Sequence, residues 1–197
     1  MYEFITFGGA GMKVCMVCYP THGGSGVIAS ELAVGLAASG HEIHIVSYAT
    51  PFRLGSFHQN IFIHEVEVAS YPLFKYPPYT LGLATKLAEV ASDEQLDIIH
   101  AHYAVPHAVS AFLAREIIGE GAPKIVTTLH GTDITLVGAD ESFHRVTRFA
   151  MQVSDAVTAV SQYLKRRTNA GIHPITEISG IPQAAPPLHN LNLTNNH

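Results

Sequence analysis

A glycine-rich segment, HGGSG, occupies residues 22–26. Glycines between a strand and a helix let backbone N–H groups approach an anion, and the helix N-terminus attracts a phosphate or carboxylate. The spacing is not that of a G-x-G-x-x-G motif, and no Lys-Ser/Thr pair follows as in a P-loop, which disfavours a nicotinamide or ATP site. The structural alternative is a tight turn that needs the positive φ glycine allows.

Histidines form a second group. The segment HAHYAVPH places His100 and His102 two residues apart on one face of a strand end, and His130 ends a later strand. Some metallohydrolases present two imidazoles to a metal in this way, so a metal-dependent hydrolase using these three histidines is one hypothesis. Against it, the chain contains 13 histidines and shows no carboxylate-rich surroundings for a metal site. Hydrogen-bonded or substrate-facing histidines without metal are favoured.

The segment TTLHGTD, residues 127–133, follows the same strand-end pattern. His130 and Thr132 carry hydrogen-bond donors, and Gly131 permits a close backbone approach. Asp133 either caps the next segment or accepts a hydrogen bond from a hydroxyl group. A purely structural capped turn remains the alternative.

Arg148 is an isolated cation in the largely apolar helical segment VTRFAMQ. A guanidinium suits a carboxylate ligand, and a surface salt bridge is the alternative. Cys15 and Cys18 lie in one apolar run, three residues apart and on opposite strand faces, so we expect neither a disulfide nor a redox pair.

Short β-rich runs alternate with longer helical patterns along the chain, which predicts an α/β, Rossmann-like, doubly wound and mostly parallel sheet. Ligands of such sheets bind at the carboxyl ends of the strands. The run 61–68 alternates strictly and predicts a strand near a sheet edge. The pattern predicts strands at 13–19, 42–48, 61–68, 96–102, 124–130 and 155–161, with a further strand at 175–179, and helices at 27–39, 80–92, 106–119, 141–152 and 161–168.

The length, 197 residues, suits one domain, and the net charge of −5 offers no basic face for a polyanion, so nucleic acid is not an expected partner. No apolar run approaches the roughly 20 residues that a membrane helix needs. The first residues do not follow the order of a signal peptide, so we expect a cytoplasmic protein without a membrane span.

Taken together, these segments resemble retaining, GT-B-fold glycosyltransferases of family 4. The stretch KVCMVCYPTHGGSGVIASELAVGLAASGHEIHIVS is similar to the opening of such enzymes. Further stretches resemble the members that transfer N-acetylglucosamine from UDP-N-acetylglucosamine to L-malate in bacillithiol biosynthesis: PFRL, HEVEV, FKYPPY, LDIIHAHYAVPHA, IVTTLHGTDIT, RFA and SDAVTAVSQYL. The resemblance covers about residues 12–168.

The resemblance implies roles for particular residues. In that family two Rossmann-like domains face a cleft, the N-terminal one holding the acceptor and the C-terminal one the donor. His130 would lie beside the transferring sugar as the catalytic residue. The donor-diphosphate loop would comprise Gly23, Gly24, Ser25 and Gly26, the acceptor site Arg148, Tyr103, Thr132 and Ser25, and the weaker candidates Lys75, Arg53 and Asp133.

The same resemblance implies that no metal is required and that the protein self-associates as a homo-oligomer. Residues 1–11 match nothing in the family, and residues 169–197 predict an irregular tail where the family continues into a donor domain. Because that domain is missing, we expect the chain alone not to transfer sugar. A family-4 half with another acceptor, the metal-dependent hydrolase and a non-catalytic malate-binding module are the alternatives.

Overall fold

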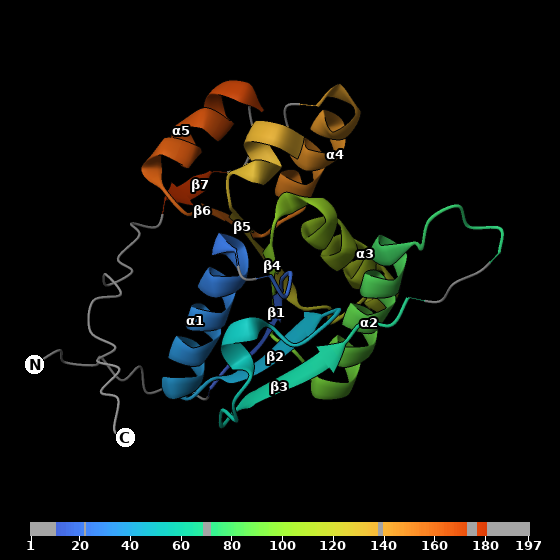
Figure 1. Ribbon diagram of the computed structural model, residues 1–197, viewed down its shortest axis with the longest axis vertical. Helices are drawn as coiled ribbons and strands as arrows, with labels where there is room; N and C mark the ends of the chain where they lie inside the picture. Colours follow the sequence, from blue (N-terminus) through green and yellow to red (C-terminus); the bar gives the residue numbers. More distant parts are fainter. Residues whose placement is uncertain (1–10, 22, 69–71, 138–139, 173–176, 181–197) are drawn as a thin grey trace, which may run out of the picture.

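A computed structural model describes residues 11–21, 23–68, 72–137, 140–172 and 177–180. Within them one sheet of seven parallel strands runs in the order β3-β2-β1-β4-β5-β6-β7, with helices on both faces (Figure 1). The strands are β1 (Lys13–Val17), β2 (Glu42–Ser47), β3 (Ile61–Glu65), β4 (Ile98–His102), β5 (Lys124–Leu129), β6 (Ala156–Ala159) and β7 (Ile178–Gly180). The α-helices are α1 (Gly24–Ala38), α2 (Tyr79–Glu94), α3 (Val109–Ile118), α4 (Glu141–Gln152) and α5 (Gln162–Gly171).

The central strands are buried on both faces, as expected of a parallel sheet covered by helices. On one face Val14 and Met16 of β1 pack with Ala29 and Ala33 of α1. On the other face α2 and α3 pack against β1, β4 and β5, with Leu87 of α2 fully buried. Figure 1 shows α1 on one side of the sheet and α2 with α3 on the other. The predicted α/β, Rossmann-like fold class is therefore confirmed.

Several predicted boundaries need correction. The strand predicted at 61–68 ends at Glu65, although β3 does form the predicted sheet edge. The helix predicted from Pro106 follows a kink at Val105, the one residue of segment 104–108 with non-helical dihedral angles, and its regular α-helical part, α3, starts at Val109. The strand predicted at 175–179 overlaps β7, which pairs with β6, and Thr168 lies within α5. Residues 173–176 and 181–197 of the predicted tail lie outside the described residues.

The two cysteines behave as expected. Cys15 and Cys18 are free, buried, and packed in the clusters on opposite faces of the sheet, although Cys18 follows the last residue of β1. Burial raises the pKa of the Cys18 thiol to about 12, so it is protonated and unreactive near neutral pH. No helix in the described part of the chain has the length and apolar character needed to cross a membrane.

Candidate functional site

The carboxyl ends of β4 and β5 bring three of the predicted site residues together. Tyr103 follows β4 and His130 follows β5, and their rings lie 5.1 Å apart between centroids. The Thr132 hydroxyl donates a long hydrogen bond of 3.5 Å to the Tyr103 hydroxyl. Two of the predicted acceptor residues, Tyr103 and Thr132, therefore share one edge of the sheet with the predicted catalytic histidine.

Asp133 organises the loop that carries His130. Its carboxylate accepts hydrogen bonds from the backbone N–H groups of His130 at 3.1 Å and Gly131 at 3.0 Å, and a longer one from Ala104 at 3.4 Å. Gly131 adopts φ +102°, which glycine adopts without strain. Asp133 is fully buried, and this burial raises its pKa to about 6. Asp133 therefore follows the capped-turn alternative: its buried carboxylate accepts hydrogen bonds from backbone N–H groups and is not exposed to a ligand.

The histidines of β4 are engaged with protein neighbours. His100 Nε2 lies 2.7 Å from the Thr128 hydroxyl oxygen, while His102 Nδ1 lies 2.9 Å from His130 Nε2. Burial lowers the pKa of His100 and of His130 to about 4, so both rings are neutral near pH 7. These three histidines do not converge into a group of metal ligands in the described part of the chain. The geometry gives no support to the metal-dependent hydrolase.

The glycine loop enters α1 without a side-chain cap and without an acidic residue in the first turn. The first N–H groups of this helix therefore remain available to an anion. Gly23 has φ −82°, and none of the loop glycines described has a positive φ, so the alternative of a turn requiring positive φ is wrong. A Cβ on Gly26 would collide with the Thr21 backbone oxygen, whereas around Gly24 there is open space. Packing therefore explains why position 26 is a glycine, but it does not explain the glycine at position 24. His22, the first residue of the segment, lies outside the described residues.

Arg148 lies on α4, which begins at an Asp140 cap whose carboxylate accepts from the Ser142 N–H. This helix packs against the segments 104–108 and 133–137 that follow β4 and β5. Arg148 Nε is buried and has no hydrogen-bond partner among the described residues, and no described carboxylate forms an ion pair with it. The surface salt bridge considered from the sequence is therefore not seen, and the guanidinium has unused donor capacity.

Two weaker candidates are engaged elsewhere. Arg53 follows β2 and lies 3.7 Å from the Glu31 carboxylate of α1. Lys75 is exposed before α2 and stacks over the Tyr76 ring at 5.4 Å. No contact joins either side chain to the loop of His130 within the described residues.

An aromatic cluster at the same sheet edge was not predicted. The Tyr19 ring lies 4.4 Å from that of His107 and 5.7 Å from that of Tyr103, measured between centroids. Tyr48 and Tyr79 complete the cluster. Tyr19, Tyr48 and Tyr103 each lie within two residues of a strand's carboxyl end, and that shared position is the signal that identifies them.

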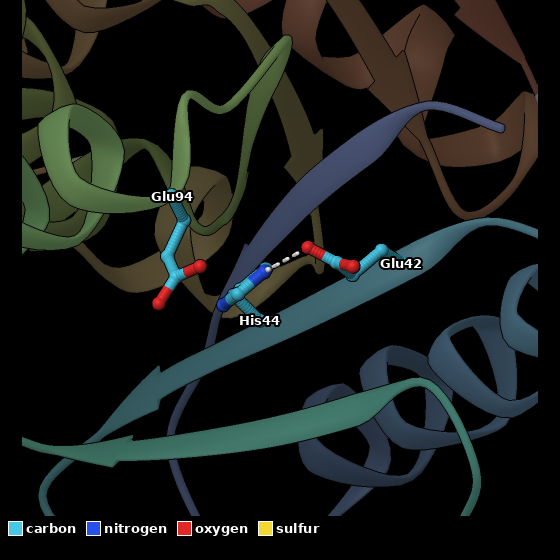
Figure 2. Close-up of side chains that lie close together, drawn as sticks. All are labelled: Glu42, His44 and Glu94. Atoms are coloured by element: carbon cyan, nitrogen blue, oxygen red, sulfur yellow. Dashed lines mark hydrogen bonds and ion pairs between the residues drawn. The ribbon is translucent and has the colours of Figure 1, made fainter. Parts of the chain in front are cut away.

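One group of metal-ligand type lies elsewhere, at the amino-terminal end of β2 (Figure 2). Its three ligand atoms, from Glu42, His44 and Glu94, lie within 4.8 Å of one another. Glu42 Oε1 already contacts Lys13 Nζ at 2.8 Å and His44 Nε2 at 3.1 Å, and these contacts lower the pKa of the carboxyl group. His44 Nδ1 contacts His64. Protein partners therefore already engage Glu42 and His44.

Comparison with known proteins identifies a matching family and a similar enzyme. The family model described as Glycosyltransferase Family 4 matches residues 22–183. The N-acetyl-alpha-D-glucosaminyl L-malate synthase of Bacillus anthracis is 51% identical over 170 residues, which are 86% of this chain and 44% of that protein. The chain thus spans less than half the length of this relative.

Solved structures show the same fold. A glycosyltransferase from Rickettsia africae superposes with a TM-score of 0.65 at 24% identity, covering 87% of this chain and 42% of that one. The Anabaena protein HepE, in complex with UDP and glucose, superposes with a TM-score of 0.62 at 15% identity, covering 86% and 44%. With most of its length matched by the family model, the chain belongs to glycosyltransferase family 4.

Proposed function

We propose that this chain is the acceptor-binding part of a retaining glycosyltransferase that transfers N-acetylglucosamine from UDP-N-acetylglucosamine to L-malate. The support from comparison is the 51% identity with the Bacillus anthracis synthase, whose name states that product. The support from the structure is the position of the candidate residues: the glycine loop follows β1, and Tyr103 and His130 follow the neighbouring parallel strands β4 and β5.

L-malate carries two carboxylates and one hydroxyl group, and the site offers groups that match each. Arg148, whose guanidinium Nε has no hydrogen-bond partner among the described residues, suits one carboxylate. The uncapped N-terminus of α1, with Ser25 in its first turn, suits an anion. Tyr103 and Thr132 supply hydroxyls for the polar remainder of the acceptor.

Transfer with retention passes through a transition state of oxocarbenium character, while negative charge grows on the departing UDP phosphate. Backbone N–H groups at the glycine loop would stabilise that charge, which is where such catalysis gains most. Holding the malate hydroxyl beside the anomeric carbon supplies the rest. In this proposal His130 lies beside the transferring sugar, and no metal takes part.

Isothermal titration calorimetry of the purified chain with three ligands tests the proposal. L-malate should bind with measurable heat. Succinate, which lacks the hydroxyl, should bind about 5- to 10-fold more weakly, because one hydrogen bond contributes roughly 1 kcal/mol. Absence of heat with L-malate, or equal affinity for succinate, would refute the assignment of L-malate as acceptor.

A family-4 protein with another acceptor would bind neither dicarboxylate. The same titration with a panel of hydroxyl-bearing sugars distinguishes that outcome, since a signal with a sugar and none with L-malate assigns the site to a different acceptor.

A further inference from the structure

His102, at the end of β4, has no role in the proposed function, yet it contacts its neighbours through three different groups. Its backbone oxygen accepts a hydrogen bond from His107 Nδ1. Its ring Nδ1 lies 2.9 Å from His130 Nε2. Its ring stacks between those of His100, at 4.6 Å, and His130, at 5.1 Å. The side chain is wholly buried.

The pair of facing nitrogens shares one hydrogen. Burial lowers the pKa of His102 well below its usual value and that of His130 to about 4, so both imidazoles are neutral near pH 7. Each neutral ring carries its hydrogen on one nitrogen only. Either His130 donates from Nε2 to His102 Nδ1, or His102 donates from Nδ1 to His130 Nε2.

The other nitrogen of His102 decides between these arrangements. His102 Nε2 is buried and has no hydrogen-bond partner among the described residues. If His102 were the acceptor, its hydrogen would sit on Nε2 as a buried N–H without a partner, and such orphaned donors are rare in proteins. If His102 is the donor, only an acceptor lone pair is left without a partner at Nε2. Buried acceptors without a partner are less rare than buried donors without one.

His107 provides an independent precedent beside it. Because a carbonyl oxygen only accepts, His107 must carry its hydrogen on Nδ1, which leaves a lone pair on Nε2. That Nε2 is also buried without a partner among the described residues. The same cluster therefore already holds one unused imidazole lone pair.

We propose that His102 is a positioning residue that donates from Nδ1 to His130 Nε2 and so fixes His130 as the tautomer with its hydrogen on Nδ1. The partly exposed His130 ring then offers a neutral N–H donor to an oxygen atom of the ligand, and its Nε2 is occupied. That this oxygen belongs to a sugar substrate rests on the proposed function, whereas the tautomer does not. His130 is thereby a donor and not a general base at Nε2.

Nuclear magnetic resonance of the chain with ¹⁵N-labelled histidine tests this assignment directly. Long-range proton–nitrogen correlation distinguishes the two tautomers of a neutral imidazole, and loss of the signal in a His130→Gln sample assigns it. In the unmodified chain His130 should carry its hydrogen on Nδ1. A hydrogen on Nε2 of His130 would overturn the proposal without need of any variant.

Two variants of similar size separate positioning from packing. In His102→Asn the side-chain amide keeps a donor near the place of Nδ1, so His130 should keep its tautomer. In His102→Leu the donor is lost, and His130 should shift its hydrogen to Nε2. An unchanged tautomer in a folded His102→Leu protein would contradict the proposal; should that protein not fold, the unmodified chain and His102→Asn decide. A malate titration of the same unmodified sample reports on the proposed function separately.

Discussion

At the scale of single residues, the Tyr103 hydroxyl is the proposed ligand-binding group that a substitution removes with the least other change. Tyr103→Phe deletes one hydrogen-bonding group and little else, so L-malate affinity should fall by about 1 kcal/mol, roughly 5-fold. The ring contacts with Tyr19 and His130 persist, and the free energy of unfolding should change by less than about 0.5 kcal/mol. Calorimetry and urea denaturation measure the two effects. Tyr163→Phe, at an exposed position of α5, is the matched control.

Residue types at strand ends were predictable, but their partners were not. The glycine loop, His130 and Thr132 could be found because each follows an apolar run, and a parallel sheet brings such ends to one edge. The aromatic cluster depends on which ends are adjacent, and β2-β1-β4 adjacency is a property of the strand order. The pairing of Arg53 with Glu31 and the loop-closing bonds of Asp133 likewise require three-dimensional positions.

At the scale of elements, two glycines in the first turn of α1 differ in how closely other backbone atoms approach them. Gly26→Ala should destabilise the chain by about 1–3 kcal/mol, because its Cβ meets the Thr21 backbone oxygen and the turn must shift. Gly24→Ala has open space and a better helix former, so its free energy of unfolding should stay equal or rise by up to about 1 kcal/mol. Denaturant unfolding of the two variants compares them. Equal destabilisation would contradict the distinction drawn between the two glycines.

Helix and strand types followed from periodicity, whereas some boundaries did not. α4 occupies the predicted range 141–152, since a capping Asp140 and an amphipathic pattern mark it locally. The helix predicted from Pro106 follows the non-helical Val105, and only its regular α-helical part, α3, begins later, at Val109. The segment 104–108 also contacts β4 and β5, which a local pattern cannot show.

At the scale of the whole molecule, the buried titratable groups predict that the free energy of unfolding falls in acid. Burial lowers the pKa of His100, His107 and His130 to about 4, so the unfolded chain binds more protons than the folded chain between pH 6.5 and about 4. Their stabilising effect is complete above pH 6.5 and is lost as the pH falls through this window. Asp133, with its pKa raised to about 6, acts oppositely, since its folded form gains a proton first.

Three histidines outweigh one carboxyl group, and a shift of one pKa unit corresponds to about 1.4 kcal/mol. The free energy of unfolding should therefore fall by several kcal/mol between pH 6.5 and 4. Urea denaturation at half-unit pH steps measures this slope. His107→Gln should make the slope shallower by about one proton, because this buried ring no longer titrates. A free energy that stays flat over this window would contradict neutral, buried histidines.

The central claim is that the carboxyl edge of this sheet binds a hydroxydicarboxylate through the guanidinium of Arg148, which forms no ion pair in the described part of the chain. Titration of L-malate into two variants of the same helix tests it most directly. Arg148→Ala should lose at least 10-fold in affinity, because a charge-assisted hydrogen bond is removed, while Arg145→Ala, at an exposed position one turn earlier, should bind as the unmodified chain does. Equal L-malate affinity in folded Arg148→Ala and Arg145→Ala proteins would contradict the account.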